Sequence, residues 1–186
     1  QITINYLEVL LLMYIKKVNK ITIIGSPGSG KTTLAERFSQ MYDLSVLNLD
    51  EVHWKDTWIK NNDEVILNTI DIFLKKNNWI IEGNYKNFLL NRRLEEATLI
   101  IFLDFNTFIS FYRVLRRYIY FIFYPYNKNP ISNKINFKFI LNIIFKQKYR
   151  SIELHKFISP YLYKTIIIKN QNKLNSYLKQ IGVNYE

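Results

Sequence analysis

The chain has 186 residues, of which 48% are hydrophobic and 22% are charged. This composition is ordinary for a folded protein and argues against disorder, and the length suits one domain with a sizeable core. No cysteine is present, which excludes disulfides and thiolate metal sites, and the two histidines are too far apart in sequence to suggest a metal site.

The formal net charge of +11 has two explanations that the sequence leaves open. Positive charge attracts polyanionic partners, such as nucleotides, nucleic acid or an acidic membrane surface. Equally, an enrichment in Lys, Asn, Ile and Tyr runs along the whole chain, as expected from an AT-rich coding sequence. Net charge alone therefore identifies no partner, and the sequence leaves monomer and homodimer open.

The beginning of the chain predicts an N-terminal extension over residues 1–19, ahead of a single main domain over residues 20–186. The sequence starts with Gln, and Met13 lies shortly before a basic stretch that leads into the first strand. We therefore expect Met13 to be the natural start and residues 1–12 to be foreign to the native protein.

Two apolar segments bear on the location of the protein in the cell. Residues 7–15 and 118–124 are both well short of the roughly 20 residues that cross a bilayer. The first contains Glu8 and lacks the basic flank and the small-residue cleavage site of a signal peptide. We therefore expect a cytoplasmic protein with no membrane span.

The main domain opens on a short apolar run, residues 21–24, that predicts a strand. Residues 25–32 follow and read Gly-Ser-Pro-Gly-Ser-Gly-Lys-Thr, which matches the pattern G-x-x-x-x-G-K-[ST] and precedes a helix-like stretch. This order of strand, loop and helix identifies a P-loop, whose backbone N–H groups and helix N-terminus bind phosphate.

Each residue type in this loop has a chemical reason. Gly25 lets the chain leave the strand sharply, and Gly28 and Gly30 let the backbone curl around phosphate oxygens. Lys31 is expected to reach the β- and γ-phosphates, and the Thr32 hydroxyl to hold Mg²⁺. ATP and Mg²⁺ are the expected cofactors, and the predicted nucleotide-binding residues are Gly25, Ser26, Pro27, Gly28, Ser29, Gly30, Lys31, Thr32 and Thr33.

A helix over residues 31–41 and a strand over residues 45–49 follow, and the strand ends at Asp50. Ligands of open α/β sheets gather at the carboxyl ends of the strands, which places Asp50 near the phosphates or the acceptor substrate. The aromatic segment after it, with Trp54 and Trp58, is predicted as a loop. Its tryptophans either wall a substrate pocket or pack against the domain.

A helix over residues 62–76 leads to a second buried strand, residues 79–81, that ends at Glu82. An acid at the end of an apolar strand can orient Mg²⁺ or its water shell near a P-loop. Thr32 and Glu82 are therefore the predicted metal-supporting residues.

The alternation continues with a helix over residues 86–96, a strand over residues 98–103 that stops at Asp104, and a helix from near Asn106. Near-continuous apolar strands alternating with helices imply a parallel sheet covered on both faces.

The helix from near Asn106 carries Arg113 and Arg117, which are four residues apart and so share one face. There they could clamp a nucleotide's phosphates and stabilise charge in a transition state. Arginines on a helix more often form a solvated face, so this local pattern leaves both readings open.

Residues 118–150 are the least regular part of the chain and are predicted as a lid-like region or insertion. Within them, residues 137–149 are aromatic, lysine-rich and amphipathic, and could cover the nucleotide or bind nucleic acid. A strand over residues 165–168 and a helix over residues 172–181 complete the domain, with Gly182 as the expected C-terminal cap.

Several of these stretches together resemble the FlaR-type topology modulation proteins, a branch of the adenylate-kinase-like P-loop kinases. They are the strand and P-loop up to Thr32, LNLDEVHWK from Leu47, WIIEGNY from Trp79, IIFLD ending at Asp104, and RVLRR from Arg113. The resemblance covers roughly residues 20–117. It implies an α/β three-layer sandwich with a five-stranded parallel sheet between helices, and ATP-dependent phosphoryl transfer.

The same resemblance bears on individual residues. Arg113 and Arg117 have the spacing of the arginines at the lid boundary in nucleoside monophosphate kinases. After the third strand, adenylate kinases have Asp-Gly with a nearby arginine. This chain has Glu82 and Gly83 there, and its arginines come later, at Arg92 and Arg93. Asp50 is similar in position to the acidic residue that interacts with a substrate hydroxyl in shikimate and gluconate kinases. The acceptor therefore stays open between a nucleotide and a small hydroxylated molecule.

Two functional hypotheses follow. The first is a small kinase in which Lys31, Asp50, Arg113 and Arg117 are catalytic and an unidentified acceptor receives the phosphoryl group. The second is a nucleic-acid-binding regulator of DNA topology that uses ATP as a switch. Its predicted contact surface consists of Lys128, Lys134, Lys138, Lys146, Lys148 and Arg150.

Overall fold

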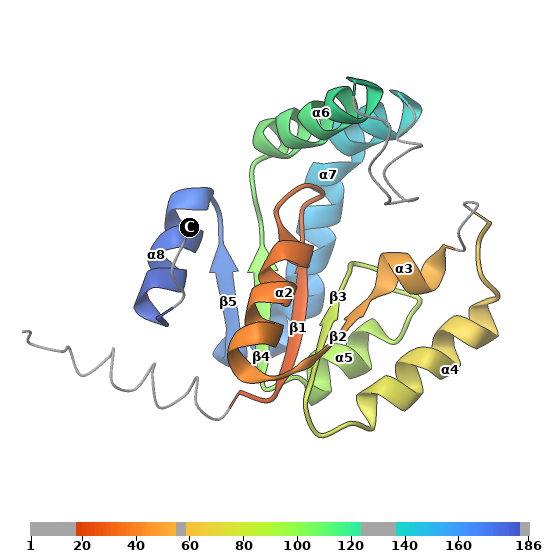
Figure 1. The fold of residues 1–186 in the computed structure, drawn as a ribbon, viewed down its shortest axis with the longest axis vertical. Helices are drawn as coiled ribbons and strands as arrows, with labels where there is room; N and C mark the ends of the chain where they lie inside the picture. The colour runs from red at the N-terminus through yellow and green to blue at the C-terminus, as the bar shows by residue number, and fades with distance from the viewer. Residues whose placement is uncertain (1–17, 55–58, 124–136, 183–186) are drawn as a thin grey trace, which may run out of the picture.

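The computed structural model describes residues 18–54, 59–123 and 137–182, and its centre is one parallel β-sheet (Figure 1). The strands, in the spatial order β2-β3-β1-β4-β5, are β1 (Lys20–Gly25), β2 (Ser45–Asn48), β3 (Trp79–Glu82), β4 (Leu99–Leu103) and β5 (Thr165–Ile168). Each neighbouring pair is parallel. The predicted α/β class with a five-stranded parallel sheet is therefore confirmed.

Helices connect the strands, and a short 3-10 helix over Ser159–Lys164 precedes β5. Asparagine side chains accept backbone hydrogen bonds at the starts of α3, α4 and α8, as good N-caps do. The helices are α2 (Lys31–Tyr42), α3 (Leu49–His53), α4 (Asp63–Leu74), α5 (Leu90–Glu96), α6 (Thr107–Phe123), α7 (Phe137–Ile158) and α8 (Gln171–Gln180).

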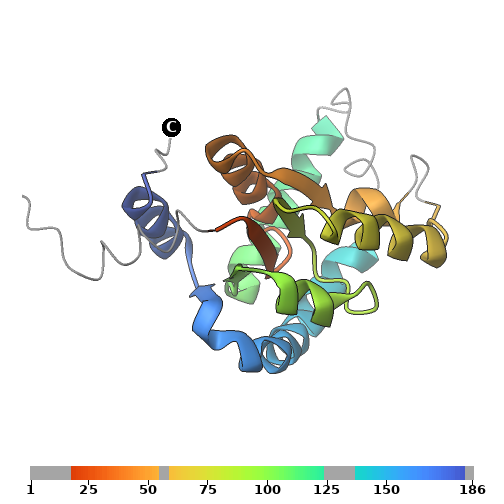
Figure 2. The same cartoon turned by 90° about the horizontal axis from the view of Figure 1, so that it is seen from below.

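The sheet is covered on both faces because successive strand residues point to opposite sides. In β1, Ile21 and Ile23 pack in a core with α2 and α8, whereas Ile24 packs in a second core with α4, α5 and α7. Figure 2 shows the sheet between these two helical layers. α6 belongs to neither layer and lies beyond the carboxyl ends of the strands, above the sheet in Figure 1.

The helices of the second half are longer than the sequence predicts. Residues 118–123, predicted as irregular, form the end of α6, and α7 extends well past residue 149 to Ile158. Residues 124–136, the rest of the predicted lid-like region, lie outside the described residues, as do Met13 and the rest of residues 1–17. α7 is 22 residues long, yet neither it nor any other described helix is long and apolar enough to span a membrane.

Candidate active site

The P-loop lies between β1 and α2 and is held in shape by β4 and the segment after it. The Ser26 N–H donates to the Leu103 carbonyl at 2.9 Å, and Ser26 Oγ donates to the Phe105 carbonyl at 3.0 Å. At Gly25, φ is +148°, and an added Cβ would stand 2.4 Å from the Leu103 carbonyl oxygen. Only glycine fits at this position, because any side chain would push the loop off β4.

The end of the loop is open to an anion. Gly30, with a φ of +89°, is the N-cap of α2, and as a glycine it has no side chain to cap the first N–H groups of the helix. The first N–H groups of the helix are therefore placed to bind phosphate oxygens. Lys31 Nζ donates to the carbonyls of Gly25 and Ser26 at 3.1 and 3.0 Å, which folds its ammonium group over the same loop.

Thr32 and Glu82 meet beside this loop although they are 50 residues apart. Thr32 Oγ1 donates to Glu82 Oε1 at 2.7 Å, and Glu82, the last residue of β3, is only 2% exposed. A hydroxyl oxygen and a carboxylate oxygen are the hard ligands that Mg²⁺ takes alongside substrate phosphates. The residues present therefore fit a Mg²⁺ ion that binds together with a nucleotide.

The buried position of Glu82 changes its acidity. Burial raises the pKa of its carboxyl group, and the charge of Lys31 and the hydrogen bond from Thr32 offset only part of that increase. The carboxylates of Asp50 and Glu51 raise it further. Without a bound cation, ionisation of Glu82 therefore destabilises the folded protein relative to the unfolded chain.

Replacing Glu82 by glutamine should stabilise the unliganded protein more at about pH 8 than at about pH 5. Because the folded-state pKa of Glu82 is raised, its favourable contribution to folding is present at low pH and is lost as the pH rises through that pKa. Glutamine stays neutral, and its amide oxygen can still accept from Thr32. Thermal unfolding of both proteins at the two pH values measures the effect, and an equal change in Tm at both would contradict it.

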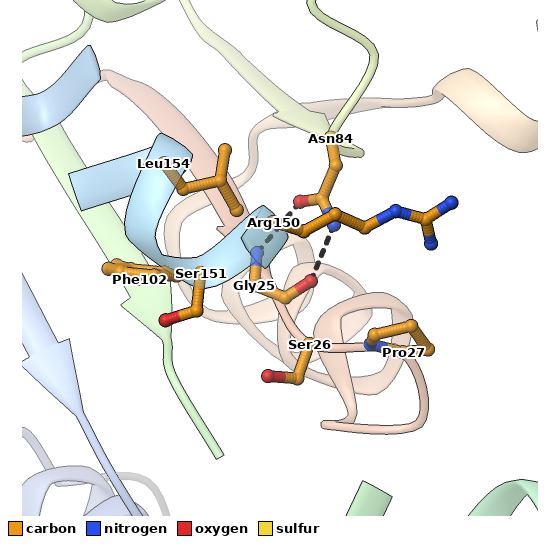
Figure 3. Close-up of a pocket in the computed structure, with 8 residues that line it drawn as sticks. All are labelled: Gly25, Ser26, Pro27, Asn84, Phe102, Arg150, Ser151 and Leu154. Carbon is orange, nitrogen blue, oxygen red and sulfur yellow. Dashed lines mark hydrogen bonds between the residues drawn. The ribbon is translucent and has the colours of Figure 1, made fainter. Parts of the chain in front are cut away.

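Asn84 secures the start of the P-loop, although the sequence does not single it out as a site residue. The Gly25 N–H donates to Asn84 Oδ1 at 2.8 Å, and Asn84 Nδ2 donates to the Gly25 carbonyl at 2.6 Å. Figure 3 shows both hydrogen bonds. The amide side chain thus takes the place of a neighbouring strand after β3 has ended. The signals in the sequence that point to it are its position two residues after Glu82 and its place in the stretch WIIEGNY.

Asp50 lies in the first turn of α3 and not directly after a strand, which corrects the prediction. β2 ends one residue earlier than expected, at Asn48, because the Asn48 side chain accepts from the Asp50 N–H at 2.9 Å and starts the helix. The exposed Asp50 carboxylate accepts a hydrogen bond from the Tyr85 hydroxyl at 2.7 Å. α3 and the turn after β3 therefore meet at the carboxyl end of the sheet.

Aromatic side chains cluster beside Asp50. The ring centroid of His53 lies 4.7 Å from that of Tyr85 and 5.4 Å from that of Phe88, and Tyr85 stacks on Phe88 at 5.3 Å. Trp54 meets His53 edge-on at 4.5 Å. Trp54 therefore packs on this cluster, while Trp58 lies outside the described residues.

Arg113 reaches the P-loop from α6. Its Nη1 lies 3.4 Å from the Gly28 carbonyl, its Nη2 donates to Gln171 Oε1 at 2.8 Å, and its guanidinium lies 5.2 Å from the centre of the Phe105 ring. Arg117 is one helical turn further along α6, and its side chain lies outside the described part of the structure. A cation therefore stands beside the phosphate-binding loop, and the role of Arg117 stays a prediction.

A pocket of about 290 Å³ opens next to the P-loop, where α2, α6 and α8 come together. Its lining is mixed in character, with guanidinium and amide groups as well as leucine side chains. Such a lining suits a planar, hydrogen-bonding group such as a nucleotide base. The lining residues are Ser29, Gly30, Thr33, Leu34, Arg37, Arg113, Gln171, Leu174 and Leu178.

The two arginines of α5 have structural partners. Arg92 forms ion pairs with Asp71 of α4 and with Glu96. Arg93 is fully buried, and it donates from Nη1 to the Gly83 carbonyl at 3.0 Å and from Nη2 to the Tyr85 carbonyl at 2.8 Å. Burial lowers the pKa of Arg93. This side chain therefore holds the turn that carries Asn84 and Tyr85.

α7 covers another side of the P-loop. Arg150, Ser151 and Leu154 line a small cavity together with Pro27 and Asn84, as Figure 3 shows. Arg150 is exposed and extends past Asn84 in this view.

The predicted nucleic-acid surface is described only in part. Lys146 and Lys148 are exposed on α7, as is Arg150. Lys128 and Lys134 lie outside the described residues, and so does the side chain of Lys138.

Comparisons with known proteins bear on the fold. No protein-family model and no curated protein matches the chain. Shikimate kinase from Bacteroides thetaiotaomicron has a similar structure, with a TM-score of 0.50 and 16% sequence identity over 88% of this chain and 96% of that one.

Two further solved structures are similar at lower TM-scores. An uncharacterised protein from Eubacterium ventriosum has a TM-score of 0.47 and 16% identity over 89% of this chain and 99% of that one. Shikimate kinase from Acinetobacter baumannii in complex with shikimate has a TM-score of 0.44 and 14% identity over 81% and 99%. At 16% identity the similarity to the first structure shows the fold alone.

Proposed function

We propose that this chain is a small kinase, of the FlaR type that its sequence resembles, which transfers the γ-phosphoryl group of ATP to a small acceptor. The observation that carries the proposal is the hydrogen bond from Thr32 to the buried carboxylate of Glu82, beside Lys31 on a phosphate-binding loop. Burying a carboxylate costs free energy. A metal-nucleotide complex would offset that cost, whereas a glycine-rich turn without a ligand would not.

The proposal assigns parts of the nucleotide to parts of the site. The phosphates would bind the N–H groups of residues 28–32 and the ammonium of Lys31, and the base would enter the pocket beside Arg113 and Gln171. Thr32 and Glu82 would hold Mg²⁺, which supplies positive charge to the phosphates when bound. Arg113, with Arg117 proposed beside it, would neutralise charge on the transferring group.

The proposed reaction is an in-line displacement at the γ-phosphorus. The acceptor oxygen forms a bond to phosphorus as the bond from phosphorus to the bridging oxygen of ADP breaks, and Asp50 takes the proton of the acceptor hydroxyl. The protein contributes positioning and fixed charge, because phosphoryl transfer needs little other chemistry from it.

ATP turnover in the presence of Mg²⁺ and a panel of acceptors tests this proposal. We expect at least one nucleoside, nucleotide or small hydroxylated metabolite to raise ADP release about tenfold or more above the acceptor-free rate, since binding the acceptor places its hydroxyl for attack. ATP binding without stimulation by any acceptor would contradict the kinase assignment.

That negative outcome would favour the second candidate, a nucleic-acid-binding regulator of DNA topology that uses ATP as a switch. The observation that favours it is that Lys146, Lys148 and Arg150 are exposed on α7, where Lys146 and Arg150 are four residues apart and share one face. Binding to nucleic acid through such residues would weaken steeply with rising salt.

A further inference from the structure

α6 packs closely on the P-loop at Gly28. The φ of Gly28 is +67°, and a Cβ added there would stand 3.1 Å from Val114 Cγ2 and 3.4 Å from Arg113 Cβ. The contact between loop and helix therefore fixes the point from which the Arg113 side chain extends. It leaves the direction of the guanidinium open, because arginine is a long side chain with many rotamers.

Three contacts set the direction of that guanidinium. Nη1 lies 3.4 Å from the Gly28 carbonyl oxygen, which is long for a hydrogen bond, and the group lies 5.2 Å from the centre of the Phe105 ring. Nη2 donates to Gln171 Oε1 at 2.8 Å, which is within the ordinary range. Because the bond to Gln171 is the short, directional contact of the three, Gln171 contributes most to the orientation of Arg113.

Gln171 is itself held in place at the start of α8. The N-cap of this helix is Asn170, whose side chain accepts from the Lys173 N–H at 2.9 Å. The amide nitrogen of Gln171, the first residue of the helix, donates to Asn175 Oδ1 at 2.7 Å. With its nitrogen bound to Asn175, the amide of Gln171 presents its oxygen to Arg113.

Gln171 and Arg113 both line the pocket beside the P-loop in which the proposed nucleotide places its base. Arg113 thus has one hydrogen bond to the phosphate-binding loop and one to a residue of the base pocket. Arginine carries five N–H donors, and these bonds use two of them, so donors remain for phosphate oxygens. Gln171 therefore joins the base pocket to the cation beside the phosphates.

From this arrangement we infer that Gln171 is a positioning residue for Arg113, which it aims at the phosphates, so that the base pocket is linked to phosphoryl transfer. The inference rests on the proposed kinase function and on the role of Arg113 in it. A cation that is already aimed at the developing charge stabilises the transition state more than one that has first to be ordered. Loss of Gln171 should therefore lower kcat rather than raise the KM for ATP.

Gln171→Met tests this inference, because methionine keeps the length of the side chain but cannot accept from Arg113 as an amide oxygen does. ADP release by the full chain is measured with ATP, Mg²⁺ and a panel of nucleosides, nucleoside 5′-monophosphates and cyclic polyols, and the acceptor with the highest turnover is used for the variants. We expect kcat to fall about tenfold, as for the loss of one hydrogen bond to a charged group, and the KM for ATP to stay within about threefold.

The matched control is Gln180→Met. Gln180 is an exposed glutamine at the end of the same helix, so this variant makes the same chemical change away from Arg113. It should change neither kcat nor the KM for ATP.

A double-mutant cycle separates positioning from a direct contact between Gln171 and the base. Arg113→Met alone should lower kcat by roughly 10²-fold. If Gln171 acts through Arg113, adding Gln171→Met to that variant should change kcat by less than about twofold. Losses that multiply, or an unchanged kcat in Gln171→Met or Arg113→Met alone, would overturn the inference and leave the kinase proposal standing. No stimulation of the original protein by any acceptor would overturn both.

Discussion

Replacing Lys31 by methionine is expected to lower acceptor-stimulated ADP release by roughly 10²- to 10³-fold, the usual cost of removing one preorganised charge from a transition state. The Lys31 ammonium lies over the P-loop, where it contacts the Gly25 and Ser26 carbonyls. Methionine keeps most of the length and the apolar stem of lysine but has no charge to offer the phosphates.

The control for this variant is Lys75→Met. Lys75 lies at the end of α4, its side chain is 67% exposed, and it pairs with Asp71 on the helix surface. Removing it takes away the same charge without touching the P-loop, so turnover should stay within about twofold of the original and stability within about 0.5 kcal/mol. If Lys31→Met kept more than about a tenth of the activity, the proposed role of the loop in phosphoryl transfer would be wrong.

Replacing Arg93 by methionine is expected to destabilise the folded protein by about 2–4 kcal/mol. Two effects oppose each other at this site. Methionine removes a buried charge whose desolvation is unfavourable, as the lowered pKa of Arg93 indicates. It also leaves the Gly83 and Tyr85 carbonyls without their donors, at 3.0 and 2.8 Å in the present structure. We expect the loss of two charge-assisted hydrogen bonds to dominate because both acceptors are backbone groups of one tight turn.

The neighbouring arginine provides the matched control. Arg92 is part of the same helix, but its side chain is 38% exposed and its partners, Asp71 and Glu96, are partly exposed as well. Arg92→Met should therefore cost no more than about 1 kcal/mol. Urea unfolding of the two variants measures both values, and an Arg93→Met protein as stable as the original would show that desolvation of the guanidinium outweighs its hydrogen bonds.

Loss of Arg93 should also affect the part of the proposed active site that faces the acceptor. Because its guanidinium holds the Tyr85 carbonyl, the turn that presents the Tyr85 hydroxyl to Asp50 would become less ordered. The acceptor KM of Arg93→Met should therefore rise together with the loss of stability, while that of Arg92→Met should not.

The sequence by itself determined the fold class and the phosphate-binding loop. Both are local signals: apolar runs of strand length alternate with helical periods, and eight adjacent residues, 25–32, contain the P-loop pattern. The acidic residues that follow the strands could also be predicted, because a carboxylate directly after an apolar run, as at Glu82, is a local sequence pattern. Element ends were less well predicted where one side chain decides them, as Asn48 does for β2 and α3.

Only the tertiary structure decided which of these residues act together. Thr32 meets Glu82, Asn84 meets Gly25, and Tyr85 meets Asp50 across 35 to 59 residues of sequence. These pairs arise because parallel strands align their carboxyl ends in a register that no local pattern contains. The same holds for Arg93, which becomes completely buried once the sheet and α5 pack together, a position that no local pattern in the sequence predicts.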